Sequence, residues 1–256
     1  MELFDSHAHY NDEQFDKDRF EIIDAIYKSG VTKIINAGYS LESSKKAIEI
    51  ANDYDFMYTT AGISPNDIED FKEEYLDEIE TLANNKKVVA IGEIGLDYHW
   101  NTENKELQKK VFISQIEIAN KLNLPIVIHT REAVYDTLDI LKNKIKCIKK
   151  GVFHCCPLNI DLVREGLKLG FYISFAGPIT FKNSKNAEEV INMVPLDKML
   201  IETDSPYLSP EPLRGKRNDS RNVKYIAQKI SEIKEIKIED IAKNTYNNAK
   251  NIFELK

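Results

Sequence analysis

Short apolar runs alternate with amphipathic segments along the whole chain. Several runs, such as VVAIGE and LPIVIH, are apolar almost throughout, which is typical of strands buried on both faces of a parallel sheet. Runs of this kind predict strands at Glu2–His7, Lys33–Gly38, Phe56–Gly62, Val88–Glu93, Leu124–His129, Gly151–His154, Phe171–Phe175 and Met199–Thr203.

Segments with helical periodicity separate these runs. Between residues 104 and 122, apolar side chains recur three to five positions apart and form one stripe, as in an amphipathic helix. Similar patterns predict helices at Asp16–Ser29, Leu41–Asp53, Lys72–Ala83, Ala133–Ile145, Asp161–Leu169, Asn183–Met193, Asn218–Ile233 and Ile238–Phe253. The last two are consecutive helices after the final strand.

Eight strands, each followed by a helix, predict a single-domain (β/α)₈ barrel that spans residues 1–256. An open doubly wound sheet is the alternative fold. Its nucleotide-binding version is disfavoured because the chain has no glycine-rich phosphate loop of the G-x-G-x-x-G or G-x-x-x-x-G-K type.

The composition is that of a globular protein, with 42% hydrophobic and 30% charged residues. A net charge of −7 argues against nucleic-acid binding through a large basic surface, although a nuclease that binds phosphate through metal ions remains allowed. No apolar run approaches the ~18 residues of a membrane span, and the N-terminus lacks the apolar stretch of a signal peptide. We therefore expect a soluble, cytoplasmic protein with no membrane partner.

The three cysteines are Cys147, Cys155 and Cys156. An odd number with two adjacent residues does not indicate a disulfide framework, and a spaced C-x-x-C zinc motif is absent. We expect buried free thiols.

Most of the histidines share one position relative to the predicted strands. Four of the five, together with one glutamate and one aspartate, lie at or just after the carboxyl end of a strand. These six residues are His7, His9, Glu93, His129, His154 and Asp204. A lone histidine at a strand end is more often a packing or capping residue, but the carboxyl ends of barrel strands meet at one mouth. The convergence of six such side chains predicts a metal site there.

Six ligands suit two divalent ions about 3.5–4 Å apart, with a carboxylate that bridges them. Adjacent strands one and eight would hold one ion through His7, His9 and Asp204. Adjacent strands five and six would hold the other through His129 and His154.

Glu93 is the expected bridge between the two ions, because strand four lies between the early and late ligands around the barrel. The ion beside Asp204 should bind more tightly, since carboxylate charge stabilises a dication. Mg, Mn and Zn all remain open as the metal.

The chain resembles the TatD family of metal-dependent deoxyribonucleases, within the amidohydrolase-like metal-dependent hydrolases. The segments that match are FDSHAHYNDEQF, NAGYS, TAGISP, AIGEIGLDYHW, QKKVFISQIEIANKLNLPIVIHTREA, GVFHCC, YISFAGPITFKN, LIETDSPYLSP and RGKRN. The resemblance implies a (β/α)₈ barrel, a divalent-metal site with the six ligands above, and phosphodiester hydrolysis. Glu93 stands where many relatives use a carboxylated lysine as the bridge, which argues against the dihydroorotase-like and phosphotriesterase-like branches.

One position departs from the family pattern. After the third strand the family usually has G-(I/V)-H-P, whose histidine is thought to face the substrate, whereas this chain has AGISP with Ser64 in that place. A serine hydroxyl can donate to a phosphate oxygen, but it carries no positive charge and is a poor general acid. We expect the scissile phosphate to be held less strongly.

Asp204 and Arg131 are expected to act on the substrate. A carboxylate beside a metal-bound water can accept its proton, which makes Asp204 the candidate general base as well as a ligand. Arg131 follows His129 by two positions and could grip a phosphate with two hydrogen bonds, or alternatively pair with Glu132 or cap the next helix.

Two further segments are candidates for substrate binding. The loop LRGKRNDSRN after strand eight carries Arg214, Lys216, Arg217 and Arg221, which would either receive a nucleic-acid backbone or form a solvated loop. Tyr98, His99 and Trp100 follow Glu93 and would either stack on a base or pack the barrel mouth.

The leading functional prediction is a metal-dependent, exonuclease-like deoxyribonuclease that acts on DNA ends or single strands by a two-metal mechanism. The alternative is a small-molecule amidohydrolase or phosphoesterase with the same metal centre, because fold alone does not decide the substrate. A non-enzymatic scaffold with a structural metal is disfavoured, since structural sites are usually closed and local. A monomer is plausible.

Overall fold

The computed structural model describes residues 1–100, 102–146 and 150–255. In these residues, eight parallel strands form one sheet in sequence order. They are β1 (Leu3–Ala8), β2 (Val31–Asn36), β3 (Met57–Ala61), β4 (Val88–Asp97), β5 (Ile126–Arg131), β6 (Gly151–Phe153), β7 (Tyr172–Phe175) and β8 (Met199–Ile201). A parallel bridge from Ala8 to Ser205 joins the two edges. The predicted barrel is confirmed, and the doubly wound alternative is wrong.

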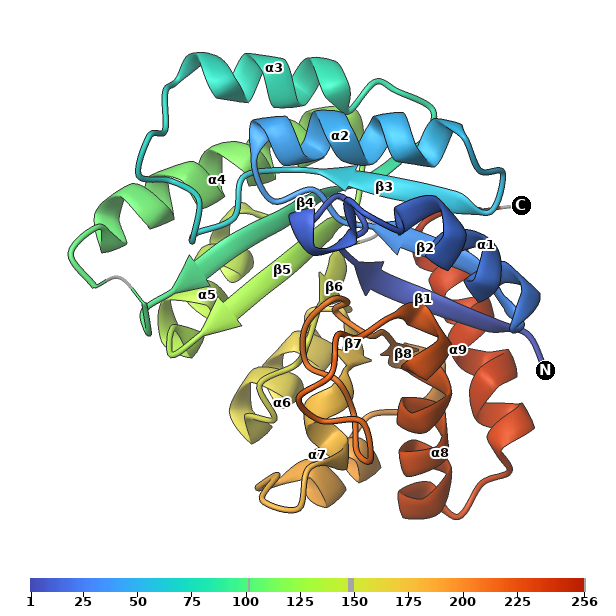
Figure 1. Ribbon diagram of the computed structural model, residues 1–256. Helices are drawn as coiled ribbons and strands as arrows, with labels where there is room; N and C mark the ends of the chain where they lie inside the picture. The colour runs from blue at the N-terminus through green and yellow to red at the C-terminus, as the bar shows by residue number, and fades with distance from the viewer. Residues whose placement is uncertain (101, 147–149, 256) are drawn as a thin grey trace.

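Helices surround the strands (Figure 1). They are α1 (Arg19–Lys28), α2 (Leu41–Asn52), α3 (Glu74–Leu82), α4 (Lys105–Leu122), α5 (Val134–Lys144), α6 (Ile160–Lys168), α7 (Ala187–Met193), α8 (Val223–Lys234) and α9 (Ile238–Ile252). Short 3₁₀ helices are η1 (Glu13–Phe15), η2 (Gly177–Thr180), η3 (Leu196–Lys198) and η4 (Ser220–Asn222). None of the helices in the described ranges is long and apolar enough to cross a membrane.

Three predicted helices begin too early, because the residues before α1, α7 and α8 form turns or a short 3₁₀ helix. Residues 218–222 are not part of α8: they include η4, whose preceding residue Asp219 accepts a hydrogen bond from the backbone of Arg221. The predictions at 16–29 and 183–193 likewise include turns before α1 and α7.

Strands β4 and β5 extend further than predicted. β4 continues four residues past Glu93 and β5 two residues past His129, so the prediction that these residues end their strands is wrong. In this extension β4 remains paired with β5, with Gly95 opposite His129 and Asp97 opposite Arg131. A register shift between Ile91 and Ile94 interrupts the strand alternation, which explains why the sequence pattern concealed the extension.

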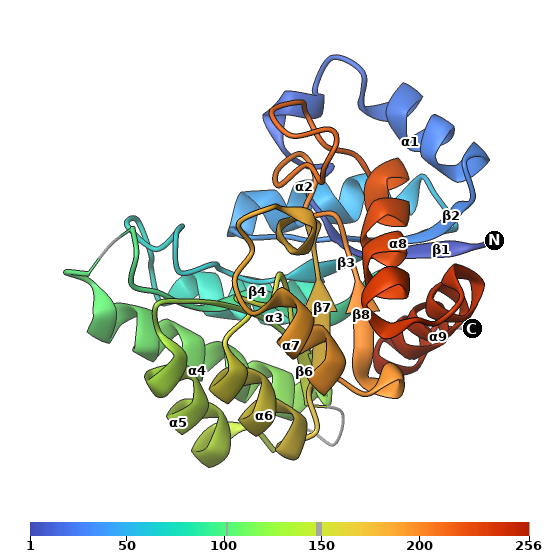
Figure 2. The same ribbon diagram turned by 90° about the horizontal axis from the view of Figure 1, so that it is seen from below.

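Helix α9 closes the end of the barrel at which the strands begin. A core cluster joins Phe4, Val127 and Leu200 from β1, β5 and β8 to Ile252 of α9 and Phe253 directly after it. Figure 2 shows α9 beside α8 and against β1 and β8. The opposite end of the barrel therefore remains available for chemistry.

Cys155 and Cys156 are free thiols, partly buried and buried respectively. The expectation of buried free thiols is thus met for Cys156 and in part for Cys155. Cys147 lies outside the described residues.

Candidate metal centre

The structure brings together all six predicted ligands at the barrel mouth. Three of the side chains lie in strands and three lie in the turns that follow strands, and most are buried: His7 in β1, His9 after it, Glu93 in β4, His129 in β5, His154 after β6 and Asp204 after β8.

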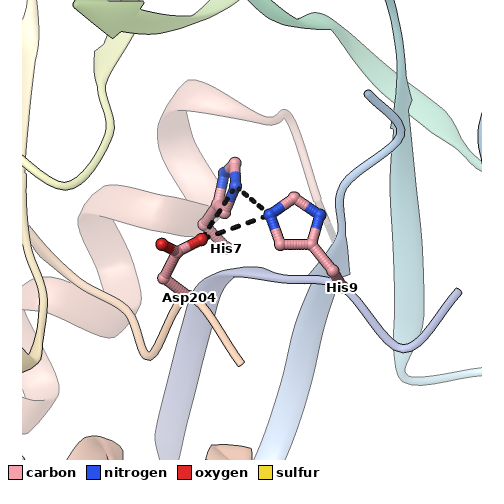
Figure 3. A group of neighbouring side chains, drawn as sticks. All are labelled: His7, His9 and Asp204. Atoms are coloured by element: carbon pink, nitrogen blue, oxygen red, sulfur yellow. Dashed lines mark hydrogen bonds and ion pairs between the residues drawn. The ribbon is translucent and has the colours of Figure 1, made fainter. Parts of the chain in front are cut away.

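A first group of ligand atoms surrounds one point beside β1 and β8. His7 Nε2 lies 3.1 Å from His9 Nε2 and 3.6 Å from Asp204 Oδ1, and His9 Nε2 lies 3.2 Å from Asp204 Oδ1. Figure 3 shows these three side chains turned toward one another. Ligands about 2.0–2.2 Å from a tetrahedral ion lie roughly 3.3–3.6 Å apart, so this spacing fits a single cation.

Glu93 faces this first group with one oxygen and a second group with the other. Its Oε2 lies 3.5 Å from His7 Nε2 and 3.8 Å from His9 Nε2. Its Oε1 lies 2.9 Å from His129 Nδ1 and 3.3 Å from His154 Nε2. The two imidazole nitrogens of the second group are 3.4 Å apart. The spacing of the two groups would suit two cations with one carboxylate between them.

Close contact between β4 and β5 brings Glu93 and His129 together. A Cβ on Gly92 would lie 2.7 Å from the Cβ of Val127. Gly95 has a φ of +146°, and a Cβ there would lie 1.9 Å from the carbonyl oxygen of His129. Only glycine at these positions lets the two strands approach so closely.

Hydrogen-bond partners behind the histidines orient their rings. His129 Nε2 lies 2.8 Å from Asp97 Oδ2, and His9 Nδ1 lies 3.0 Å from the Ala37 carbonyl oxygen. His154 Nδ1 lies 3.3 Å from Glu202 Oε1. Such partners fix which ring nitrogen faces a metal.

Sequence reasoning missed Asp97 and Glu202. Asp97 lies on the unpredicted extension of β4. Glu202 precedes Asp204 by two positions, and strand alternation could have placed both carboxylates on one face.

The surroundings of the Glu93 carboxylate favour its ionised form. Burial alone would raise the pKa of Glu93, but the charge on His154 and hydrogen bonds from His129 and His154 hold it well below its usual range. Burial would lower the pKa of His154, but the charge on Glu93 raises it well above its usual range. The Glu93 carboxylate therefore favours positive charge beside it, and the donor set of imidazole nitrogens and carboxylate oxygens fits divalent metal.

A buried carboxylate joins the two strands that carry the first group. Asp5 Oδ1 accepts a hydrogen bond from the backbone of Thr203 at 2.8 Å, and Asp5 Oδ2 accepts one from Ser220 Oγ at 2.5 Å. The backbone of Asp204 donates to the carbonyl oxygen of His7 at 2.9 Å. Burial raises the pKa of Asp5 to about 7, although these hydrogen bonds oppose the shift. Sequence reasoning also missed this residue.

A cavity of about 820 Å³ opens over the ligands. Three carboxylates line it, on Asp67, Glu93 and Asp204, whereas Arg131 is the only arginine or lysine among its described lining residues. Burial and the charge on Glu93 raise the pKa of Asp67 to about 6. Ser64 also lines the cavity, and its Oγ accepts a hydrogen bond from the backbone of Asn66 at 3.3 Å. An anionic substrate would therefore need bound cations to offset the negative charge of these carboxylates.

Arg131 does not pair with Glu132. The Glu132 carboxylate contacts His99 Nδ1 at 2.7 Å, while the Arg131 guanidinium lies 5.2 Å from the centre of the Trp100 ring. Among the described residues, no carboxylate lies within ion-pair distance of Arg131. The guanidinium thus remains available to a substrate.

Apart from Ser64, Arg131 and Trp100, the predicted substrate contacts do not line the cavity. Arg217 forms two hydrogen bonds with Asp18, at 2.9 and 2.5 Å, and Arg221 pairs with Asp219 at 2.8 Å. Arg214 lies over the ring of Phe181, 4.1 Å from its centre. Tyr98 donates its hydroxyl hydrogen to Asp136 at 2.6 Å. The structure does not bring Tyr98, Arg214 or Arg217 to the metal ligands.

Comparison with known proteins identifies close relatives over the full length. The family model "TatD related DNase" matches residues 4–254. The chain is 46% identical to the uncharacterized metal-dependent hydrolase YabD of Bacillus subtilis, over 99% of both chains. It is 30% identical to the 3'-5' ssDNA/RNA exonuclease TatD of Escherichia fergusonii, over 98% of both chains. The crystal structure of YJJV, a TatD homolog from Escherichia coli, superposes with a TM-score of 0.94 at 25% identity, covering 99% of this chain and 98% of that one.

Proposed function

Because the chain belongs to the TatD-related DNase family of metal-dependent hydrolases, we propose that it hydrolyses phosphodiester bonds at the end of a nucleic-acid strand. The observation that carries this proposal is the pair of ligand groups that share the Glu93 carboxylate. Two ions in such positions would polarise the scissile phosphate and stabilise the leaving oxygen.

Each ligand and cavity residue has a specific role in this reaction. Glu93 keeps the two ion positions at a fixed separation. Asp204 lines the cavity, and its carboxylate accepts the proton of the attacking water. Arg131 binds a phosphate oxygen, and the Ser64 hydroxyl donates to another. Asp97 and Glu202 keep the rings of His129 and His154 in their ligating orientation.

The substrate we propose is an unpaired strand. The relative from Escherichia fergusonii is named for 3'-5' cleavage of single-stranded DNA and RNA. We extend a single-strand preference to this chain because bound cations and Arg131 give a local, not an extended, site for phosphate. A cytoplasmic location, a single domain and a monomeric state stay predictions.

The direct test is release of mononucleotides from an end-labelled single-stranded oligonucleotide. We expect stepwise shortening with added Mg²⁺, Mn²⁺ or Zn²⁺, and none after chelation. Asp204→Asn should be inactive under the same conditions. Glu239→Gln, on exposed α9 surface, is the matched control and should keep full activity. Equal cleavage with and without metal, or none with any metal, would contradict the proposal.

Hydrolysis of a small phosphoester or amide is the second candidate. One observation favours it: Arg217 and Arg221 are neutralised by ion pairs, so the predicted basic loop offers no continuous track for a nucleic-acid backbone. A panel of aryl phosphodiesters, nucleotides and cyclic amides distinguishes the candidates. Turnover of a small substrate with no oligonucleotide cleavage would favour this second function.

A further inference from the structure

Trp100 is the only tryptophan of the chain, and 70% of it is exposed. It follows β4 directly at the barrel mouth and lines the cavity above the metal ligands. Its exposure at the lip of the cavity leaves an aromatic ring open to a planar group of a bound substrate.

A second cavity, of about 380 Å³, also has Trp100 in its lining. The other residues that line it include Pro65, Asn66, Ile68 and Glu69. Because Trp100 and Asn66 line both cavities, the two cavities meet at these residues. A flat ring that borders both cavities can stack against an occupant of either one.

Apolar side chains also stand on the far side of the mouth. Tyr207 and Leu208 follow β8, which lies opposite β4 in the order of eight strands, and both line the larger cavity. They are 47% and 37% exposed. The Tyr207 hydroxyl donates to Asp12 at 2.6 Å, which holds its ring in place. A planar group in the larger cavity would therefore meet apolar surfaces from two directions.

The charges around Trp100 indicate where a phosphate would lie. Arg131 sits 5.2 Å from the centre of the indole ring and has no carboxylate partner among the described residues. The smaller cavity has no arginine or lysine in its described lining, and presents the Asn66 amide and the Glu69 carboxylate. Both groups can accept hydrogen bonds from the amino groups of a base, and the Glu69 carboxylate would repel a phosphate. Phosphates thus belong on the Arg131 side and a base on the Asn66 side.

We propose that Trp100 separates two successive nucleotide subsites, with the terminal nucleotide over the metal ligands and the base of its neighbour stacked on the indole in the smaller cavity. This inference rests on the proposed function, because it assigns the substrate's second nucleotide at the same site. It requires an unpaired strand, since bases held in a duplex cannot be splayed around a side chain.

The fluorescence of the single tryptophan tests this subsite without any need for turnover. Titration with a single-stranded hexadeoxynucleotide in the presence of Ca²⁺ should quench the emission. A strand that is abasic at the penultimate position should quench it much less, and a blunt duplex should not quench it. Equal quenching by the abasic and normal strands, or no quenching by either, would overturn the proposal.

Substitution of Trp100 supplies the second readout, through the anisotropy of a labelled strand. Trp100→Ala should weaken binding of the normal strand about tenfold or more, and binding of the abasic strand hardly at all, whereas Trp100→Phe should retain part of the affinity. Phe20→Ala removes an exposed aromatic side chain from α1 and is the matched control. An equal loss of affinity for the normal and abasic strands would contradict the stacking role.

Failure of this inference is distinguishable from failure of the proposed function. Quenching that depends on the penultimate base, with no strand cleavage under any metal, would reject the nuclease and retain the nucleotide subsite. Strand cleavage by Trp100→Ala at the normal rate, with normal affinity, would reject the subsite and retain the nuclease.

Discussion

Replacing Asp97 by asparagine should release one metal ion and leave the other in place. Asp97 Oδ2 lies 2.8 Å from His129 Nε2, while Oδ1 accepts hydrogen bonds from the backbones of His99 and Trp100. Asparagine has only one acceptor oxygen. If that oxygen serves the two backbone donors, the amide NH₂ faces His129 and favours the ring tautomer that carries its proton on Nδ1. That nitrogen is the one that faces Glu93, so the proton opposes metal binding.

The magnitude follows from the hydrogen bond that is lost. A hydrogen bond to a charged group contributes about 1.5–3 kcal/mol, and loss of such a partner behind a metal ligand typically weakens metal binding ~10- to 100-fold. Asp97→Asn should therefore lower the affinity for the ion between Glu93, His129 and His154 by about that factor. The ion beside His7, His9 and Asp204 should keep its affinity.

Calorimetric titration of the metal-free variant with Zn²⁺ or Mn²⁺ measures both sites. Asp136→Asn is the matched control, because that carboxylate bonds Tyr98 and Lys109 and touches no ligand. Two ions bound to Asp97→Asn at the affinities of the unmodified protein would refute the role of Asp97 in orienting His129. An equal loss of affinity for both ions would refute the assignment of His129 to only one of the two ion positions.

Five other substitutions test the remaining parts of the account. Asp204→Asn should lower kcat at least ~100-fold with an unchanged circular dichroism spectrum, and substantial turnover with saturating metal would remove this residue as general base. Arg131→Ala should raise KM for an oligonucleotide about tenfold or more without changing metal affinity in calorimetry, and an unchanged KM would count against a phosphate contact. His129→Ala should weaken the binding of one ion, whereas Glu93→Gln should weaken the binding of both. If His129→Ala bound two ions with full affinity, the proposed division of the ligands between the two ions would be wrong. Phe253→Ala should lower the free energy of unfolding in urea by about 3–5 kcal/mol, and a loss below ~1 kcal/mol would mean that this residue does not plug the barrel.

The barrel and the convergence of the six candidate ligands at its mouth could be predicted because both depend on patterns local to each strand. An apolar run such as LPIVIH identifies a buried strand, and the histidine at its carboxyl end then falls at the mouth of any parallel barrel. His129, His154 and Glu93 were placed in this way without knowledge of their separation in space. The structure adds the measured distances and the division of the Glu93 oxygens between the two groups.

The residues that the sequence did not reveal act through tertiary contact. The register shift in β4 moves Asp97 next to His129, and no local periodicity signals such a shift. Asp5 joins β1 to η4 across more than 200 positions of the chain, through Ser220. Arg217 looked like a substrate ligand within a basic segment, but its partner Asp18 is as remote in sequence. Pairings of this kind depend on the closed barrel.

Anomalous diffraction from crystals soaked in Mn²⁺ tests the central claim, a shared carboxylate between two cations, most directly. We predict two peaks about 3.5–4 Å apart, one beside His7, His9 and Asp204 and one beside His129 and His154, with an oxygen of Glu93 on each. A single peak, or two peaks of which one has no contact with Glu93, would contradict the account.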